Sequence, residues 1–284
     1  MSRIEACFRG LAEQQRTALI PYVTAGDPQP GVTVPLLQAL VAAGADLVEV
    51  GVPFSDPMAD GPVIQAACER ALAHHVSLHD VLDMVREFRS TNNTTPVVLM
   101  GYLNPVEVWG YENFASAAAQ AGVDGVLTVD MPPEEAGSLK AALQDQGIDA
   151  IFLLAPTSSR ERMETVSQAA NGFVYYVSLK GVTGANRLDV NAVAGKLEEI
   201  RKHTGLPVGV GFGISDPETA AQVARIADAV VVGSALVSKV PGLADQPEAI
   251  PSALAETLAA MRAAIDQAPR SLSENSDRSE GKAD

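Results

Sequence analysis

The sequence predicts an α/β protein built as a single (β/α)₈ barrel, the TIM-barrel architecture, with an extra helix at the N-terminus. Strand-like apolar runs alternate with alanine-rich helical segments eight times along the chain. A doubly wound sheet usually has fewer strands, so this alternation favours the barrel. Three of the units also share an Asp in the turn between helix and strand, in A-G-A-D-L-V-E-V, A-G-V-D-G-V-L-T and R-I-A-D-A-V-V-V. This repeated pattern indicates that one supersecondary unit is used several times along the chain.

The elements follow from the apolar periodicity, taken in order. Over residues 2–15, Ile4, Cys7, Phe8 and Leu11 recur at helical spacing, which predicts an amphipathic helix that closes one end of the fold. The strands are expected at Ala18–Thr24, Asp46–Gly51, Pro96–Gly101, Asp124–Val129, Asp149–Ala155, Phe173–Ser178, Pro207–Gly211 and Asp228–Gly233. The helical segments between them include Pro35–Ala43, Val63–Ala73, Leu78–Arg89, Asn113–Gln120, Glu134–Gln146, Arg160–Ala170, Val190–His203 and Pro217–Ala227.

Composition limits the class of protein. The chain has 284 residues, 47% of them hydrophobic, which is enough for a large core, and its net charge of −15 argues against non-specific binding to nucleic acid or anionic membranes. Cys7 and Cys68 show no paired spacing, the N-terminus carries charges where a signal peptide would be apolar, and no run is long enough to span a membrane. We therefore expect a soluble, cytoplasmic protein. No linker divides residues 1–268, so we expect one domain there and a disordered polar tail over 269–284.

The stretch from Asp46 to Pro62 carries the first candidate chemistry. Its apolar strand contains one carboxylate, Glu49, and the Pro- and Gly-rich loop that follows supplies Asp56 and Asp60. Burial disfavours a charged carboxylate and raises its pKa, as a general acid near neutral pH requires. The alternative is that Glu49 lies on a solvated face of the strand and that the loop aspartates only cap turns.

The ends of later strands suggest a ligand site. The sixth strand ends near Tyr175 and enters a long loop, L-K-G-V-T-G-A-N-R, which is expected to be either a lid with ligand contacts or a loose connection. The seventh and eighth strands end in G-V-G-F-G-I-S and V-V-V-G-S-A-L, where glycines and a short helix from Ser234 favour a phosphate site built from backbone N–H groups. Alternatively, Gly209 and Gly211 only reduce bulk inside the barrel.

Other candidate sites are weaker. His75 and His79 are four residues apart, but no third ligand has a recognisable spacing, so we expect a solvated turn and no metal. Lys180 could be a Schiff-base lysine, yet beside Gly181 we expect it to be exposed and protonated, or in contact with an anion.

Together these motifs resemble the tryptophan synthase alpha chain family, over residues 1–267. The motifs that carry the resemblance are V-E-V-G-V-P-F-S-D-P-M-A-D-G-P, G-Y-L-N-P, Y-Y-V-S-L-K-G-V-T-G, and the G-F-G-I and V-V-G-S ends. The resemblance implies a barrel lyase that cleaves indole-3-glycerol phosphate to indole and D-glyceraldehyde 3-phosphate by retro-aldol chemistry, in tryptophan biosynthesis. The rival enzyme class is another phosphate-binding TIM-barrel enzyme of aromatic or histidine biosynthesis, which would need other catalytic groups, and the non-enzyme rival is a scaffold subunit.

The resemblance also implies roles for individual residues. Glu49 matches the general acid/base and Asp60 the carboxylate that accepts the indole N–H. The implied substrate-binding residues are Tyr175 by the glycerol chain, Thr183 in the closing loop, Gly184, Gly213, Gly233 and Ser234 at the phosphate, and Tyr22, Met100, Leu127, Phe212 and Val231 around the indole.

A partner and its cofactor are implied in the same way. The family's alpha chain assembles with a beta chain, as an α₂β₂ heterotetramer, and the beta chain carries pyridoxal phosphate, so no cofactor is expected in this chain. Pro53, Asp56 and Asn104 are the expected contacts. Two departures from the family concern Tyr22, where many relatives have Phe, and Leu179-Lys180, where some carry an Arg. The polar tail is a third.

Overall fold

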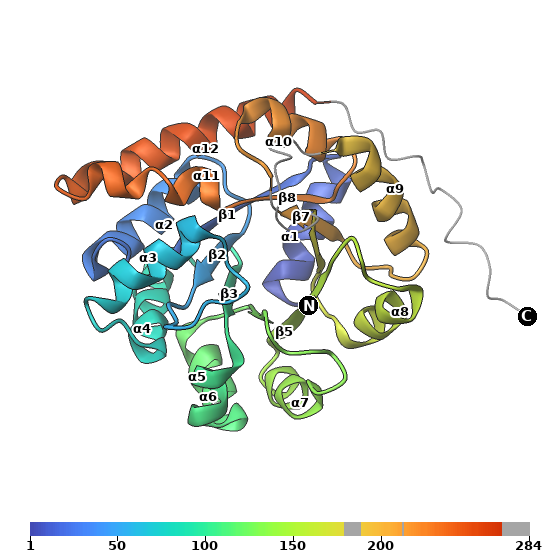
Figure 1. Cartoon of the computed structure of the whole chain (residues 1–284), viewed down its shortest axis with the longest axis horizontal. Coiled ribbons are helices and arrows are strands. Elements are labelled where there is room, and N and C mark those ends of the chain that lie inside the picture. Colours follow the sequence, from blue (N-terminus) through green and yellow to red (C-terminus); the bar gives the residue numbers. More distant parts are fainter. Residues whose placement is uncertain (179–188, 212, 269–284) are drawn as a thin grey trace, which may run out of the picture.

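The computed structural model describes residues 1–178, 189–211 and 213–268, which form a closed barrel of parallel strands in the order β1 to β8. Strand β8 pairs with β1 in parallel and completes the ring (Figure 1). The strands are β1 Ala18–Thr24, β2 Val48–Gly51, β3 Val97–Gly101, β4 Gly125–Thr128, β5 Asp149–Leu154, β6 Val174–Val177, β7 Val208–Gly211 and β8 Ala229–Val232. The predicted (β/α)₈ barrel is confirmed.

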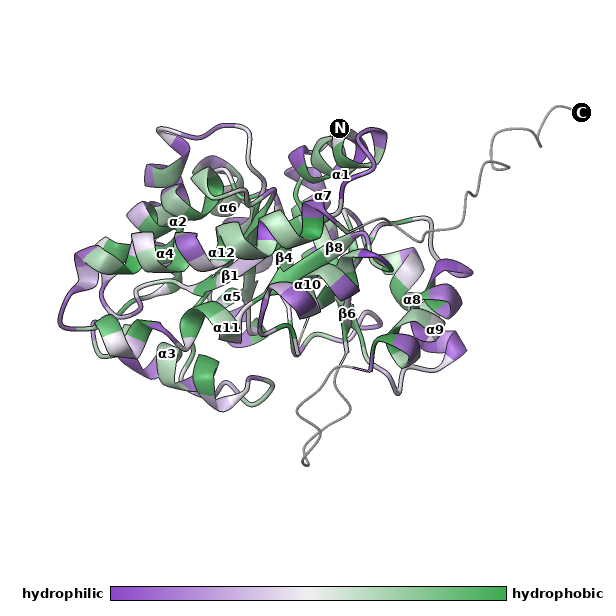
Figure 2. Ribbon diagram, turned by 90° about the horizontal axis from the view of Figure 1, so that it is seen from above, coloured by the Kyte–Doolittle hydropathy of each residue, from purple (hydrophilic) through white to green (hydrophobic). Residues whose placement is uncertain are grey.

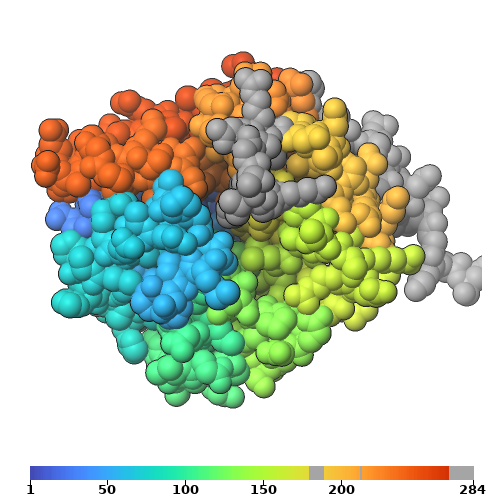
Figure 3. All heavy atoms as spheres, viewed as in Figure 1, coloured from blue at the N-terminus to red at the C-terminus, as the bar shows by residue number. Residues whose placement is uncertain are grey.

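Most of the helices surround the barrel (Figure 1). The helices are α1 Arg3–Glu13, α2 Thr33–Ala42, α3 Pro62–Leu72, α4 Leu78–Arg89, α5 Leu103–Trp109, α6 Tyr111–Ala121, α7 Gly137–Asp145, α8 Arg160–Ala169, α9 Val190–Arg201, α10 Pro217–Ala224, α11 Ser234–Val237 and α12 Ile250–Asp266. Three short 3₁₀ helices span Pro30–Val32, Val240–Leu243 and Pro247–Ala249. The space-filling view shows residues close in sequence forming adjacent sectors around the molecule (Figure 3).

Two helices, α5 and α12, were not among the expected segments. Pro105 lies in the first turn of α5, where a missing backbone N–H costs no helical hydrogen bond. Gly110 then separates α5 from α6 with a φ of 88°, a conformation that favours glycine. Helix α12 packs on α2 and α10 and buries Leu254, Leu258 and Met261.

The barrel interior is filled from its N-terminal end by α1. Ile4, Phe8 and Leu11 are buried in one cluster with strand residues, and Phe8 packs against Phe173 with ring centroids 5.6 Å apart. Ser2 caps this helix by accepting the N–H of Glu5. The prediction that the first helix closes one end of the fold is therefore confirmed, and Figure 2 shows α1 at the opposite end from α3 and α11.

The repeated Asp in the turn forms a specific contact. Because of this contact, strands β2, β4 and β8 begin after the Asp and are shorter than expected. Each Asp side chain, rather than continuing the strand, accepts a hydrogen bond from a backbone N–H of the preceding strand and pairs with a buried or half-buried Arg. These Asp–Arg clamps are Asp46 with Leu19 N and Arg262, Asp124 with Val97 N and Arg89, and Asp228 with Val208 N and Arg201. In the remaining pair of strands, Asn171 stands at the equivalent place and donates its backbone N–H to Ala150.

Because the clamps precede the strands they join, they lie at the N-terminal end of the barrel, and the C-terminal end is left for ligands. Within the described ranges, no helix is long and apolar enough to cross a membrane. The expected disordered tail, residues 269–284, lies outside the described residues, so the predicted domain boundary after residue 268 stays a prediction.

Candidate active site

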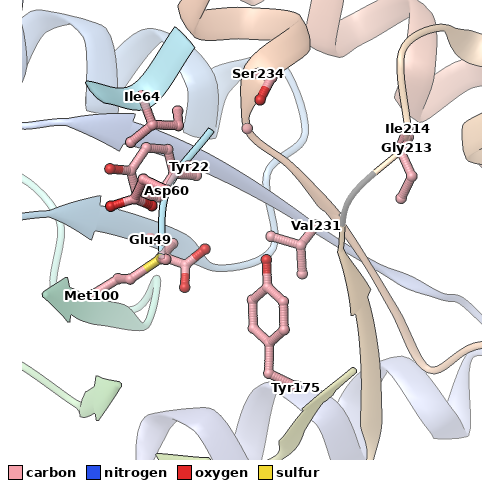
Figure 4. Close-up of a pocket in the computed structure, with 11 residues that line it drawn as sticks. Tyr22, Glu49, Asp60, Ile64, Met100, Tyr175, Gly213, Ile214, Val231 and Ser234 are labelled. Carbon is pink, nitrogen blue, oxygen red and sulfur yellow. The ribbon is translucent and has the colours of Figure 1, made fainter. Parts of the chain in front are cut away.

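A cavity of about 270 Å³ opens at the C-terminal ends of the strands. Figure 4 shows Asp60, Tyr22 and Met100 on one side of it, Gly213 and Ile214 on the other, and Glu49 and Tyr175 facing the space between. The described residues that line it are Tyr22, Glu49, Asp60, Ile64, Met100, Tyr175, Gly213, Ile214, Val231, Gly233 and Ser234. None of these described residues is Lys or Arg, so the contacts that they offer to an anion are backbone N–H groups and hydroxyls.

Glu49 lies in β2, beside Tyr22 of β1 and Val98 of β3. The side chain is 1% exposed, and neither carboxyl oxygen has a hydrogen-bond partner among the described residues. Burial raises the pKa of the Glu49 carboxyl to about 8, and the nearby Asp60 charge adds to the rise. The carboxyl is therefore mostly protonated near neutral pH and can donate a proton into the cavity. The alternative of a solvated strand face is excluded.

Asp60 reaches the same cavity from the loop between β2 and α3. Its backbone N–H donates to the Pro57 carbonyl, and its own carbonyl accepts from the Gln65 side chain at 2.8 Å. The Tyr102 hydroxyl donates to its Oδ2 at 2.8 Å. Burial raises the pKa of Asp60, whereas the Tyr102 hydrogen bond lowers it. The two acidic groups of the cavity thus have different surroundings, and such pairs are typical of acid/base sites.

Two glycines make room for the tyrosines of the cavity wall. A Cβ on Gly51 would overlap the Tyr22 hydroxyl, and a Cβ on Gly211 would overlap the Tyr175 hydroxyl. Tyr22 also forms a hydrogen bond with Thr24 at 3.2 Å. The reading of Gly211 as a residue that reduces interior bulk is therefore correct, and its function is to admit a cavity side chain.

Of the expected phosphate residues, Figure 4 shows Gly213 and Ser234 apart from Asp60. Gly213 has a φ of 77° and is exposed, and Gly233 directly precedes α11, which begins at Ser234 as expected. The first N–H groups of a helix have no partner within the helix, so those of Ser234 and Ala235 are available to a ligand. Glycine at positions 213 and 233 leaves the backbone accessible from the cavity.

The remaining predicted site residues are placed differently. Met100 and Val231 line the cavity, whereas Leu127 is fully buried in the barrel interior and is not among the described lining residues. Thr183, Gly184 and Phe212 lie outside the described residues, as do Gly181 and Lys180.

The histidine pair shows no sign of a metal site. His75 is an exposed turn residue with a φ of 58°, and His79 stacks on Trp109 with ring centroids 3.7 Å apart. Across the described residues, no group of three or more His, Cys, Asp or Glu side chains could hold a metal ion.

Sequence reasoning missed two residues of the site, Ile64 and Tyr102. Ile64 lies in the first turn of α3 and adds an apolar contact to the cavity. The only available signal was its place directly after the Asp60 loop. Tyr102 follows β3, and its position at the end of a barrel strand was the signal that could have indicated a role in the site.

Comparison with known proteins identifies the family. A family model described as "Tryptophan synthase alpha chain" matches residues 8–266. The chain is 64% identical over 266 residues to the tryptophan synthase alpha chain of Thioalkalivibrio sulfidiphilus, covering 94% of this chain and 100% of that protein. It is 62% identical to that of Nitrosococcus oceani, covering 94% and 98%. The crystal structure of tryptophan synthase subunit alpha from Legionella pneumophila aligns with a TM-score of 0.87 and 47% identity, over 94% of this chain and 99% of that one.

Proposed function

This chain belongs to the tryptophan synthase alpha chain family, and on that basis we propose that Glu49 and Asp60 are the acid/base pair of its lyase reaction. The reaction cleaves indole-3-glycerol phosphate to indole and D-glyceraldehyde 3-phosphate, a step of tryptophan biosynthesis. The observation that carries the proposal is the Glu49 carboxyl, which is buried, has no partner among the described residues and faces a cavity that also holds Asp60.

The geometry supports a sequence of proton transfers. Glu49 donates its proton to the indole carbon that bears the glycerol chain, which turns the ring into an electron sink. Asp60 accepts the indole N–H and stabilises the positive charge that develops on the ring. The Glu49 carboxylate then takes the proton of the glycerol hydroxyl as the carbon–carbon bond breaks. This leaves indole and the aldehyde, and it restores the protonated acid.

The two sides of the cavity fit the two ends of this substrate. Tyr22, Ile64 and Met100 provide an apolar wall beside Asp60 for the indole ring. Gly213, Gly233 and Ser234 would bind the phosphate through backbone N–H groups and the serine hydroxyl, with Gly184 and Thr183 contributing from the closing loop. Figure 4 shows the Tyr175 ring pointing into the space between Glu49 and Gly213, where it would contact the glycerol chain. Leu127 and Phe212 stay proposed as neighbours of the indole slot.

The purified chain, incubated with indole-3-glycerol phosphate, should release indole. The variant Gly213→Asp should raise KM for this substrate, because it places a carboxylate where the phosphate must lie. Gly137→Asp, on the exposed first turn of α7, is the matched control and should leave KM unchanged. Binding of free indole, which has no phosphate, should be little affected in either variant. Equal losses for indole and for the phosphate substrate would indicate misfolding of Gly213→Asp and would count against this placement of the phosphate.

We also propose a cytoplasmic α₂β₂ complex with a beta chain that carries pyridoxal phosphate, so that this chain needs no cofactor. Its free cysteines agree with a reducing compartment. Asp56 and Asn104 are exposed, next to the exposed apolar side chains of Met58 and Val108, which are 85% and 81% accessible. Pro53 is buried in the chain, so we omit it from the proposed contact surface.

The proposed surface can be tested by mixing the chain with a tryptophan synthase beta chain and measuring sedimentation. The wild-type mixture should form a complex of α₂β₂ mass, because the chain belongs to a family of subunits that assemble with a beta chain. Val108→Asp should weaken the complex, whereas Ala259→Asp, at an exposed position of α12 on the opposite side of the barrel from α5, serves as a control. A Val108→Asp chain that assembles as well as the wild type would contradict the proposed surface.

A further inference from the structure

Tyr102 connects the end of β3 to the loop that carries Asp60. Its side chain is 5% exposed, and its hydroxyl donates to Asp60 Oδ2 at 2.8 Å and accepts the backbone N–H of Ala59 at 3.0 Å. Its ring stacks on Phe54, with centroids 5.1 Å apart and planes inclined by 24°. One side chain therefore contacts three residues of the loop between β2 and α3, although it follows them by more than 40 residues in the sequence.

The direction of these hydrogen bonds is fixed by the atoms involved. A phenol has one proton, and the Ala59 N–H occupies an acceptor position of the Tyr102 oxygen, so the proton is directed at the Asp60 carboxylate. This is a charge-assisted bond to Oδ2. Among the described residues, no donor bonds to the other oxygen, Oδ1, and Asp60 lines the cavity. Oδ1 is therefore the oxygen that is available to a ligand N–H.

Among the described residues, the other titratable groups around Asp60 carry no positive charge that could stabilise its carboxylate. They are Tyr22 on β1, Glu49 on β2, Tyr175 on β6 and Cys68 on α3, and burial raises the pKa of each of them. All four are acids that are neutral when protonated, and none is a cation. Within the described part of the chain, the Tyr102 hydroxyl is the one group that donates a hydrogen bond to this carboxylate.

We propose that Tyr102 is a positioning residue for the lyase reaction, whose hydroxyl fixes the orientation and the negative charge of the Asp60 carboxylate. The proposal rests on the role of Asp60 proposed above. It explains how two carboxyls in one cavity serve opposite purposes: among the described residues, Glu49 has no hydrogen-bond donor and keeps its proton, whereas Asp60 has a donor and remains an acceptor. The ring of Tyr102 has a separate effect, because its contact with Phe54 holds the loop in place.

The test compares removal of the hydroxyl with removal of the stacking contact. Tyr102→Phe should lower kcat for indole-3-glycerol phosphate about 10-fold or more and move the acid limb of the kcat/KM profile to higher pH, because Asp60 then ionises less readily. Phe54→Leu keeps the hydroxyl and should leave the acid limb in place. Tyr111→Phe, which removes an exposed hydroxyl bonded to Glu107, is the matched control and should behave as wild type.

A reciprocal change keeps the shape of the side chain. Fluorotyrosine at position 102 is a stronger hydrogen-bond donor, so it should move the acid limb to lower pH, and it serves as the second variant if Tyr102→Phe folds poorly. An unmoved acid limb in both chains would overturn the proposal, and so would an equal displacement in Phe54→Leu. Asp60→Asn is measured beside them: full activity in that variant refutes the role of Asp60 itself, whereas an inactive Asp60→Asn with a wild-type Tyr102→Phe refutes only the positioning role.

Discussion

Replacing Glu49 with Gln should lower the rate of indole formation by a factor of about 10² to 10⁴, the usual contribution of a general acid or base. Gln keeps the shape of the side chain but has no proton to donate, so the phosphate substrate should still bind. In the wild type, kcat/KM should fall as pH rises through about 8, because the Glu49 carboxyl then loses the proton that the reaction requires. The measurement is steady-state indole formation across this pH range.

The same substitution should stabilise the protein. The pKa of Glu49 in the folded chain, about 8, lies above its ordinary value of 4.5. Between these values the folded chain holds a proton that the unfolded chain releases, so the stability that depends on this proton is complete below the ordinary pKa and is lost as pH rises through about 8. Gln never ionises. The free energy of unfolding of Glu49→Gln should therefore exceed that of the wild type by a margin that grows across this window, on the order of a few kcal/mol.

Glu69→Gln is the matched control, because Glu69 is exposed on α3 and should influence neither quantity. Urea unfolding at several pH values across the window gives the free energies. A Glu49→Gln chain that retains more than about one hundredth of the wild-type rate would contradict the acid/base role. A margin of stability that does not grow with pH would show that the Glu49 carboxyl is solvated and ionised in the folded chain.

Much of this fold could be predicted because the strands of a barrel are buried on both faces. Short apolar runs rich in β-branched residues, such as those of β1 and β8, are typical of strands that are buried on both faces. The Asp–Arg clamps could not be predicted, since they join residues far apart in the sequence, such as Asp46 and Arg262. The Asp in the turn was visible in the sequence as a repeat, but its partners are set by the closure of the ring.

The residues of the site also include some that the sequence could predict and some that it could not. Glu49 could be identified because a lone carboxylate in an apolar strand is costly to bury and needs a reason to be there. Tyr102 could not, because its contact with Asp60 depends on how the intervening loop folds back over the end of β3. The burial of Pro53 was likewise not visible in the sequence, since a Pro-rich loop can turn any of its residues inward or outward.

The largest loss of stability should come from Asp124→Ala, at the end of the barrel opposite the cavity. Asp124 is 5% exposed, pairs with the Arg89 guanidinium at 2.6 Å and accepts the Val97 N–H at 2.8 Å. Arg3 donates to its other oxygen at 2.8 Å. Removing the carboxylate leaves a buried guanidinium and a backbone N–H without their partner. The expected decrease in the free energy of unfolding is about 3 to 5 kcal/mol.

Asp228→Ala removes the equivalent carboxylate of another clamp and is the internal comparison. Asp228 and Arg201 are 24% and 28% exposed, so water can replace part of what is lost, and the destabilisation should be smaller. Urea unfolding gives both values, and indole formation below the unfolding transition should match the wild type, because neither residue lines the cavity. Similar losses in the two variants would show that burial does not set the strength of these clamps. A lower kcat in folded Asp124→Ala would show that the two ends of the barrel are coupled, because the clamp would then have to influence Glu49 and Asp60 through the strands between them.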